Sequence, residues 1–135
     1  MNRFSLTYLG LFLLLLSILS FFNVIYSYYF NLYLNIDAYI YTLIISLFLG
    51  FTFLIKKKTD SKISIYIKIL TLITGYLILP LIISIPYYLS IYNISYLNCF
   101  FEAVSGFTST GFTIFENIKH IDESLILWRS SSQWI

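Results

Sequence analysis

A run of small, hydroxylated residues around one glycine is the part of this chain with the most distinctive chemistry. Residues 108–113 read Thr-Ser-Thr-Gly-Phe-Thr and follow a helix-like stretch at 95–107, amid segments apolar enough to cross a bilayer. Non-helical backbone at membrane depth is tolerated only where protein or a water-filled pore surrounds it. The loop is therefore a candidate ion filter, in which backbone carbonyls replace the water shell of a cation.

Each position of this loop has an expected role. The candidate filter residues are Ser109, Thr110, Gly111, Phe112 and Thr113. Their carbonyls would be the ligands, and Gly111 permits the φ values that turn successive oxygens toward one axis. The hydroxyls of Ser109 and Thr113 would add ligands. Taken alone, Ser-Thr-Gly also marks ordinary turns between helices, so these residues by themselves leave that alternative open.

The stretch before the loop is too short to cross a bilayer. Thirteen helical residues make roughly 20 Å at 1.5 Å each, whereas the hydrocarbon core is about 30 Å thick. We therefore expect residues 95–107 to form a re-entrant half-helix with Ser95 as its N-cap. Cys99, Ala103 and Gly106 would form a small-residue stripe against a neighbouring helix. The partial negative charge at the end of the half-helix would favour a cation in the loop.

Composition and patterning predict an all-α membrane protein. Hydrophobic residues make up 59% of the 135 residues, and charged residues make up 10%. Three apolar runs, at 6–29, 38–55 and 63–89, are long enough to span a bilayer. Pro80 and Pro86 predict that the third helix is kinked in its second half. A cleaved signal peptide is the alternative for the first run, but no small-x-small cleavage site follows it.

The basic residues predict the orientation. Cytoplasmic loops carry an excess of Lys and Arg, so we expect the N-terminus with Arg3 to be cytoplasmic and the candidate filter to open outwards. Lys68 would snorkel back to the cytoplasmic surface. The lysines of the first cytoplasmic loop are Lys56, Lys57, Lys58 and Lys62. A lipid-binding role for them is the weaker alternative, because such clusters usually hold more charges.

Several function classes are not expected. Cys99 is the single cysteine and His120 lies far from it, so the sequence predicts neither a disulfide framework nor a metal cluster. The net charge of +2 is not gathered into the basic face that nucleic acid requires. No catalytic constellation is evident. We expect a protein that is not an enzyme, holds no cofactor and has membrane lipid as a partner.

Residues 85–135 resemble the first pore repeat of the TrkH-like potassium transporter subunits, in the Trk/Ktr/HKT superfamily. The matching parts are Ile85-Pro86-Tyr87, the pore-helix run 101–108, the filter 109–113, and the later segments 127–130 (Leu-Trp-Arg-Ser) and 133–135 (Gln-Trp-Ile). Separated motifs in the right order make the resemblance specific. The two preceding apolar runs match only in number and position.

The resemblance implies a potassium path surrounded by four linked repeats in the plasma (inner) membrane of a bacterium. Gly111 would be the filter glycine, supported by Glu102, Gly106 and Thr108. Ser109 stands where the family usually has Thr, and Phe112 where it often has Ala, so the preference for potassium over sodium stays open. An acid at Glu102 would hydrogen-bond the loop or add negative potential. The resemblance also implies a homodimer and a cytosolic nucleotide-binding regulatory subunit.

The last segment, 125–135, would be the start of a truncated fourth transmembrane helix, because it extends only about 16 Å. We expect Arg129 to anchor this helix at the interface, with pairing to Glu102, Asp122 or Glu123 as the alternative. Residues 1–62 would form an N-terminal helix pair with its Lys-rich loop, and 63–135 an incomplete first pore repeat. The expectation is an N-terminal fragment that is not competent alone. The alternative is a membrane-anchored scaffold or assembly protein with a relic filter motif.

Overall fold

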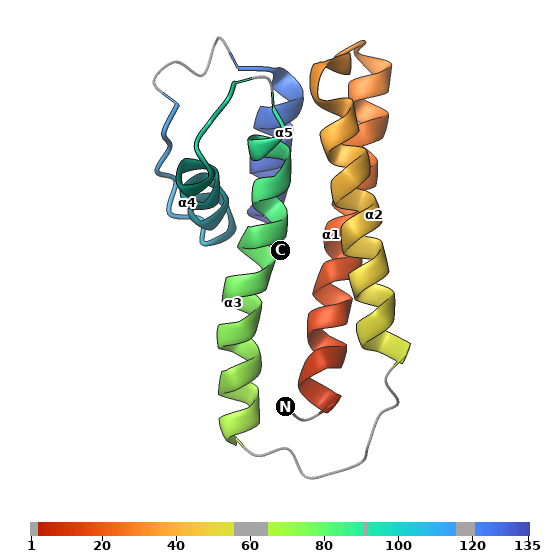
Figure 1. Ribbon diagram of the computed structural model, residues 1–135, viewed down its shortest axis with the longest axis vertical. Coiled ribbons are helices and arrows are strands. Elements are labelled where there is room, and N and C mark those ends of the chain that lie inside the picture. The colour runs from red at the N-terminus through yellow and green to blue at the C-terminus, as the bar shows by residue number, and fades with distance from the viewer. Residues whose placement is uncertain (1–2, 56–64, 91, 116–120) are drawn as a thin grey trace.

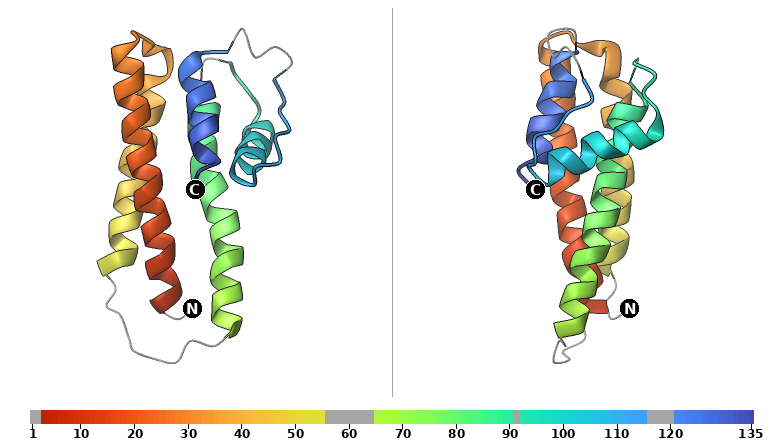
Figure 2. Two further views of the ribbon diagram at one scale, coloured as in Figure 1. Left: turned by 180° about the vertical axis from the view of Figure 1, so that it is seen from behind. Right: turned by 90° about the vertical axis from the view of Figure 1, so that its left-hand side faces the viewer.

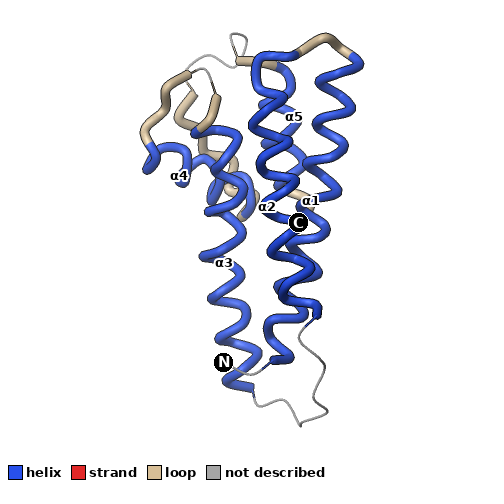
Figure 3. Tube along the Cα trace, turned by 45° about the vertical axis from the view of Figure 1, so that its right-hand side comes forward, coloured by secondary structure: helices blue, strands red, loops and turns tan. Residues whose placement is uncertain are grey.

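The described part of the chain folds into helices, as its composition predicts. The computed structural model describes residues 3–55, 65–90, 92–115 and 121–135. Within these ranges every regular element is helical (Figures 1 and 3). The elements are α1 (Arg3–Tyr29), the 3-10 helix η1 (Tyr33–Asn35), α2 (Ile36–Ile55), α3 (Ile65–Tyr88), α4 (Tyr96–Phe107) and α5 (Glu123–Ser132).

Among the described residues, three segments are long and apolar enough to span a membrane, which confirms the three predicted runs. They are Thr7–Tyr29, Tyr33–Ile55 and Ile65–Tyr88. Many large apolar side chains on these helices are exposed, among them Phe48 and Leu72. A helix with this exterior is stable where lipid covers it. The helix α3 continues through Pro80 and Pro86 to Tyr88, so neither proline ends it.

The helices α1 and α2 form an antiparallel pair closed by a tight turn (Figure 1). Asn31 has a φ of 58°, the left-handed conformation that commonly follows a helix end. The Leu32 N–H donates to the Ser27 carbonyl at 2.8 Å, and the Asn31 N–H to the Tyr28 carbonyl at 3.4 Å. These two bonds form a Schellman motif, which pairs carbonyls that the helix end would otherwise leave free.

The helix α4 lies crosswise to the long helices, beside the second half of α3 (Figures 1 and 2). Its 12 residues make about 18 Å, short of a bilayer core. Ser95 occupies the predicted N-cap position with extended backbone, but its side chain makes no capping hydrogen bond. That part of the N-cap prediction is wrong. The helix α5 begins near the end of the bundle where α3 ends and runs beside it (Figure 2).

The core contains buried side chains from α1, α2, α3, α4 and α5. The predicted small-residue stripe of α4 is buried: Cys99 and Ala103 are fully covered, and Gly106 packs against α5. Trp128 of α5 is buried and donates its indole N–H to the Ile83 carbonyl of α3 at 3.0 Å. The stripe therefore allows the close helix contact that small residues favour.

Some sequence expectations lie outside the described residues. They concern the cytoplasmic-loop lysines (Lys56, Lys57, Lys58, Lys62) and His120. Lys68, which is described, is exposed in the first turn of α3.

Candidate functional site

The candidate filter begins where α4 ends, and a Schellman motif forms that end. Thr108 is the C-cap, and Ser109 follows it with a φ of 55°. The Thr110 N–H donates to the Ser105 carbonyl at 3.1 Å, and the Ser109 N–H to the Gly106 carbonyl at 3.0 Å. Glycine usually occupies this left-handed position, because a Cβ is strained there. The chain therefore leaves α4 through a strained conformation at Ser109, which the sequence analysis named as a filter residue without predicting its positive φ.

A second left-handed residue follows at Gly111, whose φ is 82°. A Cβ built on Gly111 would meet no atom within 4 Å. The glycine is thus required by the backbone conformation and not by lack of space. The positive φ agrees with the expectation that Gly111 adopts a conformation that other residues disfavour.

Ser105 holds the loop from the face of α4 below it. Its hydroxyl donates to the Phe112 carbonyl at 2.5 Å and lies 3.1 Å from the Thr110 hydroxyl. The Thr108 hydroxyl donates back to the Val104 carbonyl at 2.7 Å. Ser105 was not among the predicted site residues. Its place one turn after Glu102 on the same helix was the available signal.

Glu102 lies behind the loop with its side chain fully buried. The Thr113 hydroxyl is 3.1 Å from each carboxylate oxygen, and the Ile114 N–H donates to Oε2 at 3.0 Å. The prediction that this acid hydrogen-bonds the loop is confirmed. A carboxylate without such partners would be unstable in this position, since buried charge must be paired and hydrogen-bonded.

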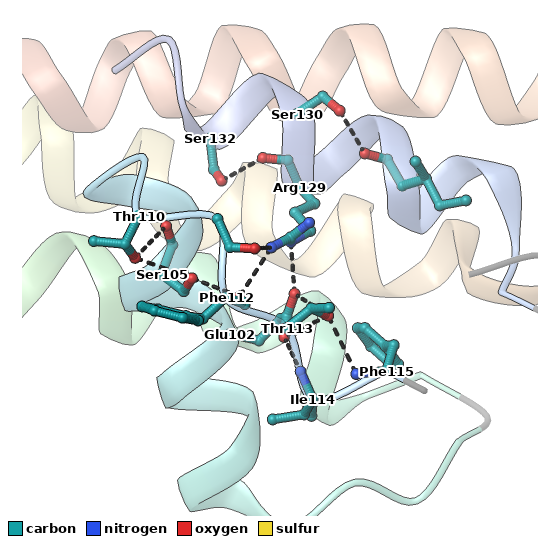
Figure 4. Close-up of polar contacts among 12 residues, drawn as sticks. Glu102, Ser105, Thr110, Phe112, Thr113, Ile114, Phe115, Arg129, Ser130 and Ser132 are labelled. Atoms are coloured by element: carbon teal, nitrogen blue, oxygen red, sulfur yellow. Dashed lines mark hydrogen bonds and ion pairs between the residues drawn. The ribbon is translucent and has the colours of Figure 1, made fainter. Parts of the chain in front are cut away.

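Arg129 of α5 supplies the opposite charge (Figure 4). Its Nε lies 2.6 Å from Oε1 of Glu102, a close ion pair whose angle departs from that of a straight hydrogen bond. Its Nη2 donates to the carbonyls of Phe112 at 2.9 Å and Gly111 at 3.2 Å. The expected anchoring role of Arg129 is therefore wrong. Of the alternative partners, Glu102 is the one that it contacts.

Two groups of predicted cation ligands, the loop carbonyls and the Thr113 hydroxyl, do not have the arrangement that was predicted. The Gly111 and Phe112 carbonyls face Arg129 and Ser105, and do not all turn toward one open axis as predicted. The Thr113 hydroxyl donates to Glu102 and accepts the Phe115 N–H at 3.2 Å, so it already has partners. Charge-assisted bonds are stronger than neutral ones, which explains why these groups face the ion pair.

The loop itself is open. Residues 108–113 are exposed, and Phe112 retains 70% of its surface. No described residue donates a hydrogen bond to the carbonyls of Ser109, Thr110 or Thr113. In the described part of the chain, no group of His, Cys, Asp or Glu is arranged to hold a metal ion. The oxygens that remain for a cation are therefore neutral carbonyls and hydroxyls.

Gly106 fixes how closely α4 approaches α5. A Cβ at this position would lie 2.7 Å from the Ser132 hydroxyl and 3.7 Å from the Arg129 carbonyl. The absence of a side chain thus brings the backbone that carries Glu102 close to the helix that carries Arg129. Gly106 therefore supports the candidate site by allowing α4 and α5 to pack closely.

No family model matches this sequence. A relative named as an uncharacterized cation transporter of Methanocaldococcus jannaschii is 34% identical over 107 residues, which are 78% of this chain and 23% of the relative. The chain is similar to cation transporters. A second relative, the Trk system potassium uptake protein TrkI of Halomonas elongata, is 36% identical over 63 residues, 47% of this chain and 12% of TrkI. The chain thus spans less than a quarter of the length of either relative.

Proposed function

We propose that this chain contributes one filter loop, residues 109–113, to a potassium-transporting pore. The observation that carries the proposal is a glycine-centred loop at the C-terminal end of a short crosswise helix, held from behind by a buried ion pair. The names of both relatives support cation transport, and that of TrkI supports potassium as the ion.

The loop has oxygens suited to a dehydrated cation. Carbonyls of Ser109 and Thr110 can approach an ion without losing a hydrogen bond to a described residue. The C-terminal end of α4 adds partial negative charge at the start of the loop. Potassium binds where carbonyl oxygens replace its hydration shell, so these two residues are the proposed ligands, with Gly111 setting their direction.

The ion pair prevents the positive charge of Arg129 from repelling a cation in the loop. Alone, the guanidinium of Arg129 would put a positive charge beside the carbonyls of Gly111 and Phe112. Glu102 neutralises this charge at 2.6 Å, while Arg129 still supplies the hydrogen bonds that fix the backbone. The pair therefore positions the loop without repelling the transported ion.

The placement in the membrane is part of the proposal. The crosswise α4 and its loop would form a re-entrant segment, with the N-terminus of α1 in the cytoplasm and the filter facing outwards. A bacterial inner membrane, a ring of four such repeats, a homodimer and a cytosolic nucleotide-binding subunit follow from the family resemblance. In a ring of four such repeats, one loop would line about a quarter of the path.

A chimera tests this function. The segment of TrkI that matches this chain is replaced by the corresponding residues, and rubidium uptake is measured in a bacterium that lacks its own potassium uptake systems. We expect uptake well above that of the host. In a second chimera, residues 108–113 are replaced by a Gly-Ser linker of equal length, and this one should not transport.

The control is Ser130→Ala, since Ser130 is exposed and bonds only within α5, to Ile126. Equal uptake by the linker chimera and the intact chimera would contradict the filter assignment. It would favour a scaffold protein in which the motif has no role in transport.

A further inference from the structure

Two faces of the helix α5 contact different parts of the protein. Arg129 and Ser132 lie on the face toward α4, where Arg129 also contacts the loop. Ser124, Trp128 and Ser131 form the adjacent stripe, which faces the α1–α2 pair. Since α5 packs mainly against α1 and α4, the α1–α2 pair has direct access to the helix that carries Arg129.

Three side-chain hydrogen bonds join the α1–α2 pair to α5. The Tyr39 hydroxyl lies 2.9 Å from the Ser124 hydroxyl, and the Asn35 Nδ2 donates to Asp122 Oδ2 at 2.8 Å. The Asn23 Nδ2 approaches the Ser131 hydroxyl at a longer 3.4 Å. We call this set the polar seam; its members are Asn23, Asn35, Tyr39, Asp122, Ser124 and Ser131.

The hydrogen bonds of the polar seam constrain the position of α5 more than apolar packing alone would. Asn23, Asn35 and Tyr39 are buried, and the Oδ1 atoms of both asparagines have no hydrogen-bond partner among the described residues. Buried polar groups in a membrane segment are expensive, so apolar side chains would hold the helices together at less cost. What directed hydrogen bonds add is one fixed rotation and register of α5.

The rotation of α5 matters because Arg129 lies one residue from Trp128 and two from Ser131. The ring of Trp128 packs against Tyr39 with centroids 5.9 Å apart. The side chain of Arg129 reaches Glu102 of α4 at 2.6 Å and two loop carbonyls at 2.9 and 3.2 Å. Turning α5 by one residue would move the guanidinium by about 100° around the helix axis and break all three contacts.

We infer that the α1–α2 pair is a positioning element for the loop, with Tyr39 as its main positioning residue, acting through α5 and Arg129. That this loop acts as a filter rests on the proposed function, whereas its mechanical connection to the α1–α2 pair does not. The Asn35 contact to Asp122 sets where α5 begins, because Asp122 is the N-cap that accepts the Ser124 N–H at 3.0 Å.

Hydrogen–deuterium exchange on the full chain in lipid nanodiscs tests the connection without any transport assay. In Tyr39→Phe, the hydrogen-bonded amides of Thr110, Ile114 and Phe115 should exchange about fivefold faster, the equivalent of one buried hydrogen bond of about 1 kcal/mol. Ser124→Ala removes the other half of the same bond and should give the same change. The matched control is Ser46→Ala, because Ser46 is buried but bonds within α2.

A second comparison distinguishes a positioning role of Tyr39 from a general destabilisation of the protein. In an Arg129→Gln background, Tyr39→Phe should cause no further acceleration, since the route through Arg129 is already lost. Unchanged loop exchange in Tyr39→Phe, or an undiminished effect in Arg129→Gln, would overturn the inference. If the exchange results hold but the TrkI chimera does not transport, the proposed function fails and the positioning role stands.

Discussion

At the residue scale, the pair of Glu102 and Arg129 decides the shape of the candidate filter. Glu102 is fully buried, whereas the Arg129 side chain retains 20% of its exposure. The carboxylate accepts hydrogen bonds from the Thr113 hydroxyl and the Ile114 N–H, and the guanidinium donates hydrogen bonds to two carbonyls that follow α4. Both charges therefore stabilise one backbone conformation from opposite sides.

Replacing Glu102 with Gln should be strongly destabilising. The change leaves the guanidinium of Arg129 without its counter-charge, and breaking a buried pair in this way costs about 3–5 kcal/mol. We expect the low end of that range because Arg129 is partly exposed. Thermal unfolding of the purified protein in detergent measures the change.

The matched control is Glu123→Gln, an exposed acid in the first turn of α5. It should alter stability by less than about 0.5 kcal/mol, as is usual for surface positions. In the double variant Glu102→Gln/Arg129→Gln, part of the loss should be recovered. Equal stability of the Glu102 and Glu123 variants would contradict the proposed role of the pair.

The sequence predicted that Glu102 lies behind the loop but not which group faces it. A cationic side chain near a helix end usually snorkels to the interface, so that statistical tendency favoured anchoring for Arg129. Its position in the fold outweighed the tendency, because α5 places the guanidinium within 2.6 Å of a buried carboxylate. The positive φ of Ser109 had no local signal either, since serine is rarely found in that conformation.

At the element scale, the contact between α4 and α5 depends on glycine. Gly106→Ala should destabilise the protein by about 1–3 kcal/mol, the usual range for overpacking, because the new Cβ would lie 2.7 Å from the Ser132 hydroxyl. Combining it with Ser132→Gly should recover most of the loss. Unfolding midpoints in denaturant provide the measurement.

Gly75 in α3 is the matched control for this change. A Cβ there would meet only Leu9, at an ordinary 3.8 Å. In a helix interior, Gly→Ala without a clash stabilises by roughly 0.5–1 kcal/mol. The two substitutions should therefore have opposite signs, and a stabilising Gly106→Ala would show that the close contact is absent.

The helices themselves were predictable because their signals are local. Length and apolarity defined three spans, and the span limits in the structure agree with the predicted runs within a few residues. The short length of α4 and its small-residue stripe also depend on adjacent sequence. The end of α4 was harder to predict, because Ser109 and not glycine occupies the left-handed position of its Schellman motif.

At the scale of the whole molecule, α2 ends beside the start of α1, at the end of the bundle away from the α1–α2 turn, whereas α4 lies crosswise beside the second half of α3 (Figure 1). If the N-terminus is cytoplasmic, a membrane-impermeant thiol reagent should label Ser109→Cys from outside and Ile55→Cys only from inside. Ile55 is 77% exposed. Labelling of intact cells against inverted vesicles measures this, and the reverse pattern would overturn the orientation.

The native cysteine should not interfere with this labelling. Cys99 is buried, and burial raises the pKa of its thiol above the ordinary value. Because the thiolate is the reactive form, Cys99 should react slowly at neutral pH. The unmodified chain is the background control, and strong labelling of it would require Cys99→Ser throughout.

The polar seam could not be predicted from the sequence. Its hydrogen bonds join residues 85, 87 and 108 positions apart, and no local pattern indicates which serine or asparagine meets which. Ser20, Asn23 and Ser27 recur at three- and four-residue intervals within α1, which marks a buried polar face. That periodicity indicates a face but not its partner.

The most direct test of the filter loop is the ion preference of Gly111 variants in the TrkI chimera, measured as rubidium uptake with and without competing sodium. At φ 82°, Asn is tolerated far better than a β-branched residue. We therefore expect Gly111→Asn to retain partial uptake and preference, and Gly111→Val to lose both, while Ser130→Ala matches the unmodified chimera. Unchanged uptake and preference in Gly111→Val would contradict the account.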